Sequence, residues 1–545
     1  MFRNMSANVH QFSMVPKADI PRSGFKIESA YKTTFDAGYL IPIYCEEVLP
    51  GDTFNLKATM FARLATPIVP VVDNMYLESF FFFVPNRLTW NKWQRFCGEV
   101  ITPGASIDFT VPQVNSAVGG FPNQSIYDYL GLPTVGQVDT GWGITANALP
   151  LRGYNLIWNE WFRDQNLQDA LDVPVDDGPD AVGDFNLVRR GKRHDYFTSC
   201  LPWTQKGAPV TLPLGVSAPV MTSAPSTPIP QGPQAPVRFR NSTTGAFVSN
   251  DGTLGVSQSG NLEYNASGIG GVAGTLYPSN LYADLSQATA ATINQIRQAF
   301  QIQKLLERDA RGGTRYTELI RSHFGVMSPD ARLQRPEYLG GGVTMVNIAA
   351  VAQTSATPTA GTETPLGALA AYGTALAHGH GFTQSFTEHG IVLGLISVRA
   401  DLTYQQGMAR MWNRKTRYDY YWPVFSHLGE QPVYNKEIYC TGVTAQDDAV
   451  FGYQERWAEY RYKPGLITSM LRSTYSQSLD IWHLAQKFPS LPALGNTFIQ
   501  DTPPIARIIA TTEQTGQQFV LDVLFKNRAV RPLPMYSVPG LVDHF

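Results

Sequence analysis

The stretch SFFFFVP, which closes the segment Met75–Pro85, places four consecutive phenylalanines in an expected β-strand. Successive side chains of a strand point to opposite faces of the sheet, so Phe81 and Phe83 share one face and Phe80 and Phe82 share the other. A strand with one face in water alternates apolar and polar residues. This strand becomes apolar on both faces, which is typical of a strand covered on both sides. The fold must therefore supply two apolar covers for it.

Strand patterns occur early in the chain and again near its end. Thr53–Ala65 alternates with a period of two, and His389–Tyr404 and Gly516–Pro534 also read as strands. A sheet completed by strands from both ends of a chain is what a jelly roll or another Greek-key sandwich requires. Between them, Gly153–Leu171 carries the apolar stripe of a helix. We therefore predict a mainly β sandwich in which the middle of the chain is an insertion.

Two segments lack the pattern of a core element. Residues 1–30, with Pro16 and Pro21, are expected to form an extended N-terminal arm. Residues 214–280 are rich in Gly and Pro and contain only four charged residues. This composition is compatible with a disordered linker, but apolar residues recur between its turn signals. We favour short irregular strands in an exposed insertion.

Charged residues make up only 16% of the chain, below the ~25% that is usual, while aromatic residues make up 12%. This balance favours a surface buried against partners, although a large internal core would also explain it. The net charge of −2 argues against a strongly basic nucleic-acid binder, so any contact with nucleic acid would be local. The four cysteines form no CxxC pair, which argues against zinc and against a disulfide framework. No secretory signal and no stretch of ~20 apolar residues is visible.

No set of residues has the spacing of a catalytic or metal site. His378, His380 and His389 lack the spacing of a helical zinc motif, so a flexible Gly-rich loop is the favoured interpretation. The neighbouring acids in Cys45–Glu47 and Gln446–Asp448 are expected to be exposed turn residues. We therefore expect no enzyme activity, no catalytic residue, no metal ligand and no cofactor.

Two basic clusters are better candidates for contacts with a partner. In RRGKRH the cations are Arg189, Arg190, Lys192 and Arg193, for which a solvated or salt-bridged loop is the favoured interpretation. The second cluster, ARMWNRKTRYDYYWP, mixes cations with aromatic residues, as single-stranded nucleic-acid sites do. Contacts between subunits have the same composition and are favoured here. Its candidate residues, DNA-facing or at a subunit interface, are Arg410, Trp412, Arg414, Lys415, Arg417 and Tyr418.

Several long motifs carry a resemblance to a known family. They are TTFDAGYLIPIYCEEVLPGDTFNL, HDYFTSCLPWTQKG, RYDYYWPVFSHLGEQPVYNKEIY, FGYQERWAEYRYKPG and the ending YSVPGLVDHF. From about Val15 to Phe545 the sequence resembles the major capsid proteins of the Microviridae, small tailless single-stranded DNA phages, and in particular their gokushovirus branch. The low-complexity segments 214–280 and 353–380 are placed only by position.

The resemblance implies one eight-stranded antiparallel jelly roll over residues 31–545, with a helical and loop insertion at about 86–338. Copies would assemble through pentamers into a T=1 shell of sixty subunits around circular single-stranded DNA. The insertion, expected after the fifth strand, would include a protrusion at the threefold axis, formed by about residues 214–280 of each copy in a trimer, that meets a host surface receptor. The virion would assemble in the bacterial cytoplasm, with small basic DNA-binding proteins and scaffolding or internal proteins as further partners.

The resemblance also implies a role for the phenylalanines. Phe81 and Phe83 would enter the sandwich, and Phe80 and Phe82 would lie under inserted helices or a neighbouring subunit, so all four are candidates for core and assembly contacts. The alternative is a glycan-binding, lectin-like jelly roll that uses the 214–280 insert. A glycan hydrolase on the same sandwich needs two convergent carboxylates, and the sequence nominates none.

Overall fold

The computed structural model describes residues 21–210, 220–222, 239–241, 253–256, 262–265, 276–278, 281–283, 293–326, 334–354, 367–510 and 516–536. Most of the predicted protrusion insert and the first part of the predicted arm therefore lie outside the described residues. The chain divides into two compact units, Met1–Thr204 with Thr314–Phe545, and Gln205–Gly313.

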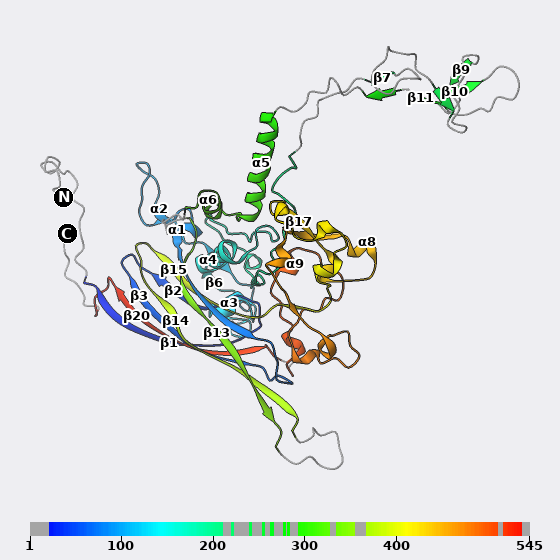
Figure 1. Cartoon of the computed structure of the whole chain (residues 1–545). Coiled ribbons are helices and arrows are strands. Elements are labelled where there is room, and N and C mark those ends of the chain that lie inside the picture. The colour runs from blue at the N-terminus through cyan, green and yellow to red at the C-terminus, as the bar shows by residue number, and fades with distance from the viewer. Residues whose placement is uncertain are drawn as a thin grey trace. The chain divides into compact units, whose positions relative to one another are not determined.

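The first unit is built on one antiparallel sheet (Figure 1). Its eight strands are hydrogen-bonded in the order β1-β20-β3-β14-β13-β4-β15-β2. In chain order they are β1 (Ser23–Phe35), β2 (Ile41–Val48), β3 (Thr53–Leu64), β4 (Met75–Pro85), β13 (Glu337–Ala352), β14 (Leu369–Ser385), β15 (Gly390–Ala400) and β20 (Phe519–Arg531). The prediction of a mainly β fold with an eight-stranded antiparallel sheet is confirmed.

The strand order is that of a jelly roll. The first strand of the sheet pairs with the last, from Ser23 opposite Arg531 to Phe35 opposite Phe519. The β13–β14 hairpin joins the half that contains β1, β20 and β3 to the half that contains β4, β15 and β2. Strands from both ends of the chain are thus needed to complete one sheet, as a double Greek key requires.

β1 begins inside the segment that we expected to be an arm. Because Ser29 and Thr33 interrupt the apolar row of Phe25, Ile27 and Tyr31, the alternation in this strand is weak. Hydrogen bonding to β20 along its whole length nevertheless holds it in the sheet. Four strands of the sheet now precede the long insertion, which therefore follows the fourth strand and not the fifth.

The predicted Gly-rich loop around His378 and His380 is wrong, because both residues lie in β14. Its inward-facing residues are small, including Ala371, Ala375 and Ala377, so the segment lacks the bulky apolar residues by which a strand is usually identified. The pairing of β14 with β3 is irregular between Ala377 and His380, where a bulge interrupts the register.

His380 is buried and both ring nitrogens have partners. Nδ1 lies 2.7 Å from Ser79 Oγ, and Nε2 lies 3.0 Å from Thr344 Oγ1. The ring packs on Gly342, where a Cβ atom would lie only 2.5 Å from it. Burial lowers the pKa of His380. These contacts are those of a core histidine, and no group of three or more potential metal ligands occurs among the described residues.

One row of phenylalanines from β4 lies inside the sandwich. The ring centroid of Phe81 is 5.6 Å from that of Phe382, and that of Phe83 is 4.8 Å from that of Phe386. Gly394 of the adjacent strand β15 makes room for the Phe81 ring, because a Cβ atom there would lie 2.8 Å from it. Both rings belong to the main hydrophobic core.

The other row lies under the chain's own insertion. The Phe82 ring centroid is 5.5 Å from that of Trp161, and the Phe80 centroid is 5.2 Å from that of Phe162. Trp161 and Phe162 belong to a π-helix (Trp158–Phe162) that directly continues α4 (Leu149–Ile157). The helix predicted at Gly153–Leu171 is thus present but ends at Phe162. A second hydrophobic core fills the space between the insertion and this face of the sheet.

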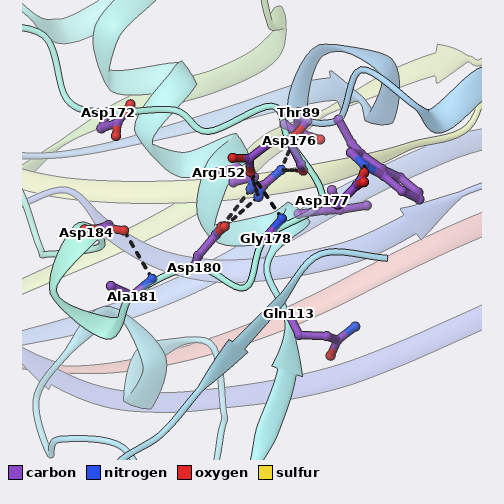
Figure 2. Close-up of polar contacts among 12 residues, drawn as sticks. Thr89, Gln113, Arg152, Asp172, Asp176, Asp177, Gly178, Asp180, Ala181 and Asp184 are labelled. Atoms are coloured by element: carbon purple, nitrogen blue, oxygen red, sulfur yellow. Dashed lines mark hydrogen bonds and ion pairs between the residues drawn. The ribbon is translucent and has the colours of Figure 1, made fainter. Parts of the chain in front are cut away.

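A buried ion pair fixes the insertion around α4. Figure 2 shows Arg152 and Asp180 pointing toward one another, with Asp176 and Thr89 beside them. Arg152 Nε and Nη2 donate to the two carboxylate oxygens of Asp180 at 2.7 and 2.6 Å. Nη1 donates to the backbone oxygens of Thr89 and Asp176, both at 2.9 Å. A further bond from Nη2 to Asp176 Oδ1 gives every N–H of this fully buried guanidinium an acceptor.

The remaining elements of the first unit are short. The helices are α1 (Asn86–Thr89), α2 (Trp93–Phe96), α3 (Ile126–Tyr129), α6 (Tyr316–Phe324), α7 (Asn435–Ile438), α8 (Thr444–Asp447) and α9 (Asn496–Ile499). The strands are β5 (Gln113–Asn115), β6 (Thr145–Asn147), β16 (Thr403–Tyr404), β17 (Glu430–Tyr434), β18 (Val450–Glu455) and β19 (Gly465–Leu466). A third hydrophobic core, which includes Phe197, Val433 and Phe451, supports the β17–β18 hairpin.

The second unit contains a helix, α5 (Ile293–Arg311), and short strands. Its strands are β7 (Val220–Thr222), β8 (Phe239–Asn241), β9 (Thr253–Val256), β10 (Leu262–Asn265), β11 (Leu276–Pro278) and β12 (Leu281–Ala283). β7 pairs with β12, β8 with β11 and β9 with β10, so the pairs are nested. Short strands were predicted here, and these are confirmed. No helix among the described residues of either unit is long and apolar enough to cross a membrane.

We predict that Phe82→Asp prevents folding or assembly. The substitution removes a buried ring and places a carboxylate against Trp161, which costs more than ~3 kcal/mol. The matched control is Val520→Asp, on an exposed position of the same sheet. Soluble yield and urea unfolding check this, and a normal particle yield from Phe82→Asp would contradict it.

Arg152→Met is expected to destabilise the first unit by about 3–5 kcal/mol, because Asp180 is left as a buried charge without its partner. The double variant Arg152→Met, Asp180→Leu removes both charges and should recover part of that loss. The free energy of unfolding of the two variants measures this. Equal stability of Arg152→Met and the unaltered chain would show that the ion pair has no structural role.

Candidate nucleic-acid and subunit interface

The first basic cluster surrounds a buried acid on β4. Glu78 Oε1 lies 2.7 Å from Arg399 Nη2 and 3.3 Å from Arg193 Nη2, and Oε2 pairs with Arg190. Burial by itself raises the pKa of the Glu78 carboxyl, but the charges and hydrogen bonds of Arg190 and Arg399 outweigh it, and the pKa lies below its usual value. Glu78 is thus ionised and paired.

Backbone hydrogen bonds of residues 188–192 also fix the position of this cluster. Arg190 N donates to Gly38 O at 2.8 Å, and Lys192 N donates to Ile499 O at 2.8 Å. The segment therefore runs between two other parts of the chain, with which it forms isolated β-bridges. The Arg189 guanidinium lies 4.0 Å from the ring centroid of Tyr39.

Lys192 is a buried cation. Its ammonium lies 4.5 Å from the ring centroid of Phe498. Burial lowers the pKa of Lys192 to about 8, against the attraction of Asp501, whose own pKa burial raises to about 6. With the contacts of Arg189, Arg190 and Arg193, all four cations of the cluster are engaged within the chain, as in a salt-bridged loop.

The second cluster lies in a segment of short 3₁₀ turns, Arg410–Asn413, Arg417–Asp419 and Pro423–Phe425. We call residues 410–424 the aromatic-basic segment. Arg410 Nη1 lies 3.1 Å from Glu437 Oε1, and Arg414 Nη2 lies 3.2 Å from Glu459 Oε1. The charges of these two arginines are therefore paired with acids of the β17–β18 region.

Most other members of the aromatic-basic segment face solvent, whereas Asn413 and Asp419 are half-buried. Trp412 is 72% exposed and Tyr418 is 68% exposed, which is unusual for side chains of this size. Lys415 and Arg417 are exposed as well, and the Arg417 guanidinium lies 4.8 Å from the ring centroid of Trp422. Further exposed apolar side chains of the segment are Met411, Tyr420, Tyr421, Trp422 and Val424.

This surface can bind either kind of partner that its composition suggests. Exposed aromatic faces beside cations stack on bases and contact phosphates. Exposed Trp, Tyr and Arg side chains are also the residues that dominate protein interfaces. Patches of this kind on a soluble chain mark sites of interaction.

Sequence reasoning missed the acids that organise both clusters, namely Glu78, Glu437 and Glu459. One signal was available for Glu78. It is a lone acid in a strand whose neighbours on the same face are Tyr76, Phe80 and Phe82. Because a buried acid almost always has a cationic partner, it could have been matched to the nearby arginines. Glu437 and Glu459 lie in irregular segments and give no such signal.

Comparison with known proteins identifies the family. The family model described as "Capsid protein (F protein)" matches residues 13–541. The chain belongs to this capsid protein family. It is 46% identical over 546 residues to capsid protein VP1 of Bdellovibrio phage phiMH2K, with 99% of each chain covered. It is 43% identical to capsid protein VP1 of Chlamydia phage 1 and 37% identical to that of Spiroplasma virus 4, with 98% of each chain covered in both.

The resemblance to the gokushovirus branch of the Microviridae is confirmed by these relatives. The chain is a structural capsid protein of the virion, and the expectation that it is not an enzyme agrees with the names of its relatives. The capsid family thus accounts for the jelly-roll sheet described above. The aromatic-basic segment combines exposed aromatic side chains with the exposed cations Lys415 and Arg417.

Glu78→Gln is predicted to destabilise the capsid protein by about 1.5–3 kcal/mol at neutral pH, because it removes the charge that pairs with three arginines. The folded state lowers the pKa of Glu78 below its ordinary value of 4.5. The ionised carboxyl therefore stabilises the fold at pH values above 4.5, and this stabilisation is lost as the pH falls through the folded pKa. The difference between the variant and the unaltered protein should therefore shrink below that value. A pH series of thermal unfolding measures it, and a difference that does not change with pH would contradict the assignment.

Proposed function

We propose that this capsid protein assembles through pentamers into a T=1 icosahedral shell of sixty copies that encloses circular single-stranded DNA. The observation that carries the proposal is the aromatic-basic segment, whose large side chains are exposed although the cores of the same unit are filled. A monomeric chain would leave this surface in water. Burial at roughly 25 cal/mol per Å² of apolar area gives a driving force for association.

The charges of the segment support a contact with the genome at the same surface. Lys415 and Arg417 are exposed, while Arg410 and Arg414 are neutralised by internal acids. A few free cations beside aromatic faces suit single-stranded DNA, in which the bases are available for stacking. By contrast, we assign Arg189, Arg190, Lys192 and Arg193 to the internal frame and not to DNA.

We further propose that the insert at about 214–280 contributes to attachment to a host surface receptor, through trimer contacts at the threefold axis. The support is its nested strand pairs, which belong to a unit separate from the jelly roll. The arm and the genome-facing side would also contact small basic DNA-binding proteins and scaffolding or internal proteins during assembly in the bacterial cytoplasm.

Particle mass tests the proposed assembly. We expect the chain, expressed in bacteria with the other assembly proteins of the phage, to form pentamers or shells far heavier than the 60.2 kDa subunit. Sedimentation followed by electron microscopy of the peak measures this. A clean monomer under these conditions would overturn the proposal.

Trp412→Asp is expected to lower the yield of particles at least tenfold while the subunit still folds, because the side chain is exposed in the subunit and, in the proposed shell, lies at a contact between copies. Trp412→Tyr is the matched control and should keep assembly, since it retains an aromatic face. Particle yield and the thermal unfolding of the free subunit are measured together. Normal assembly of Trp412→Asp would remove this residue from the proposed contacts.

A further inference from the structure

A pocket of about 500 Å³ opens behind the aromatic-basic segment. It lies between that segment and the β17–β18 region, and both belong to the first unit. Its walls include Asn413, Arg414 and Asp419 on one side and Tyr434 and Arg456 on the other.

Three buried hydrogen-bond donors that belong to this pocket have no partner. They are Asn413 Nδ2, Arg414 Nε and Arg456 Nε. A buried donor without an acceptor costs about 1–3 kcal/mol, so such groups are uncommon in proteins. Here the three side chains that carry them all line one pocket, and each unpartnered atom is a donor. A ligand that satisfies them must present acceptor atoms.

The pocket lining contains more cations than acids, and this positive balance suits an anion that carries several acceptor atoms. Its lining cations are Arg410, Arg414, Lys415, Lys436 and Arg456, and its acids are Asp419, Asp448 and Glu459. The acids are already engaged. Glu459 pairs with Arg414, Asp448 pairs with Lys436, and Asp419 Oδ2 accepts the backbone N–H groups of Lys415 and Thr416.

Two of the lining cations, Lys415 and Arg456, form no ion pair with any residue that the structure describes. Lys415 is exposed, whereas Arg456 is half-buried and its charge helps to lower the pKa of Asp419. The Arg456 guanidinium lies 4.4 Å from the ring centroid of Trp457. A half-buried arginine on an aromatic ring keeps a fixed direction, which preorganises it for an anion.

We propose that this pocket binds a phosphate group of single-stranded DNA while the adjoining bases stack on the exposed aromatic side chains of the segment. The inference rests on the proposed function and deepens it, because it assigns one phosphate site to the genome contact. A phosphate presents several acceptor oxygens to the three donors and neutralises Arg456. The neighbouring exposed rings of Trp412 and Tyr418 favour a nucleotide chain over an acidic peptide, which has no bases to stack.

The test uses the full chain in its assembled or pentameric form, with inorganic phosphate and a labelled thymidine oligonucleotide of about 12 nucleotides as probes. Asn413→Asp places a carboxylate in the pocket without changing its shape, and Arg456→Gln removes the half-buried cation that has no ion pair. Arg417→Gln is the matched control for Arg456→Gln, because it also removes one arginine charge but from outside the pocket lining. Thermal unfolding confirms that each variant is folded.

We expect phosphorus NMR to show broadening of the phosphate line by the unaltered protein and by Arg417→Gln, and none by Asn413→Asp or Arg456→Gln. Oligonucleotide affinity, measured by fluorescence anisotropy, should fall about tenfold or more in the two pocket variants. The fall in Arg417→Gln should be about threefold or less, as expected for one exposed charge.

Two results would overturn the inference while leaving the proposed function intact. In the first, particles form, but the protein does not broaden the phosphate line and the pocket variants do not change the oligonucleotide affinity. In the second, phosphate binds but the pocket variants bind the oligonucleotide normally, which would assign the pocket to an acidic segment of another copy. Failure of the proposed function is distinguished by sedimentation, which would then show no assembly.

Discussion

Apolar side chains on both faces of β4 make two covers necessary, and most of the first unit is arranged to provide them. Phe81 and Phe83 are covered by the opposing half of the jelly roll, and Phe80 and Phe82 by the π-helix that follows α4. Leaving one phenylalanine in water costs roughly 1.5–3 kcal/mol, so neither cover is dispensable. Because the second cover comes from the insertion, the insertion is part of the capsid subunit's core.

The buried acids of the first unit are likewise paired within the chain. Glu78 and Asp180 are buried with arginines that hold loops against the sheet and against α4. A buried charge is tolerated only when it is paired, so these cations are committed to structure. The two basic clusters, which both resemble nucleic-acid sites in the sequence, therefore differ in their availability to a partner. Those around Glu78 are internal, whereas Lys415 and Arg417 are exposed beside large aromatic side chains.

The sheet could be predicted from the sequence wherever side chains are bulky and alternate. Thr53–Leu64 and the double-faced β4 are of this kind, and the capsid motifs supplied the rest of the topology. β1 and β14 were missed because Ser, Thr, Ala and Gly weaken their apolar rows, and pairing with distant strands decides their structure. The candidate site was found by its mixture of Arg and Trp. Its acids and its unpartnered donors could not be found, because they meet only through the tertiary fold.

The covers of β4 are intramolecular, and we propose that the aromatic-basic segment is covered only on assembly. Hydroxyl-radical footprinting of the free subunit and of DNA-filled particles tests both statements in one experiment. Phe82 and Trp90, which are buried in the subunit, should be protected in both samples. Trp412 and Tyr418 should react in the free subunit and become protected in the particle. Full reactivity of Trp412 and Tyr418 in filled particles, or reactivity of Phe82 in the folded free subunit, would contradict the account.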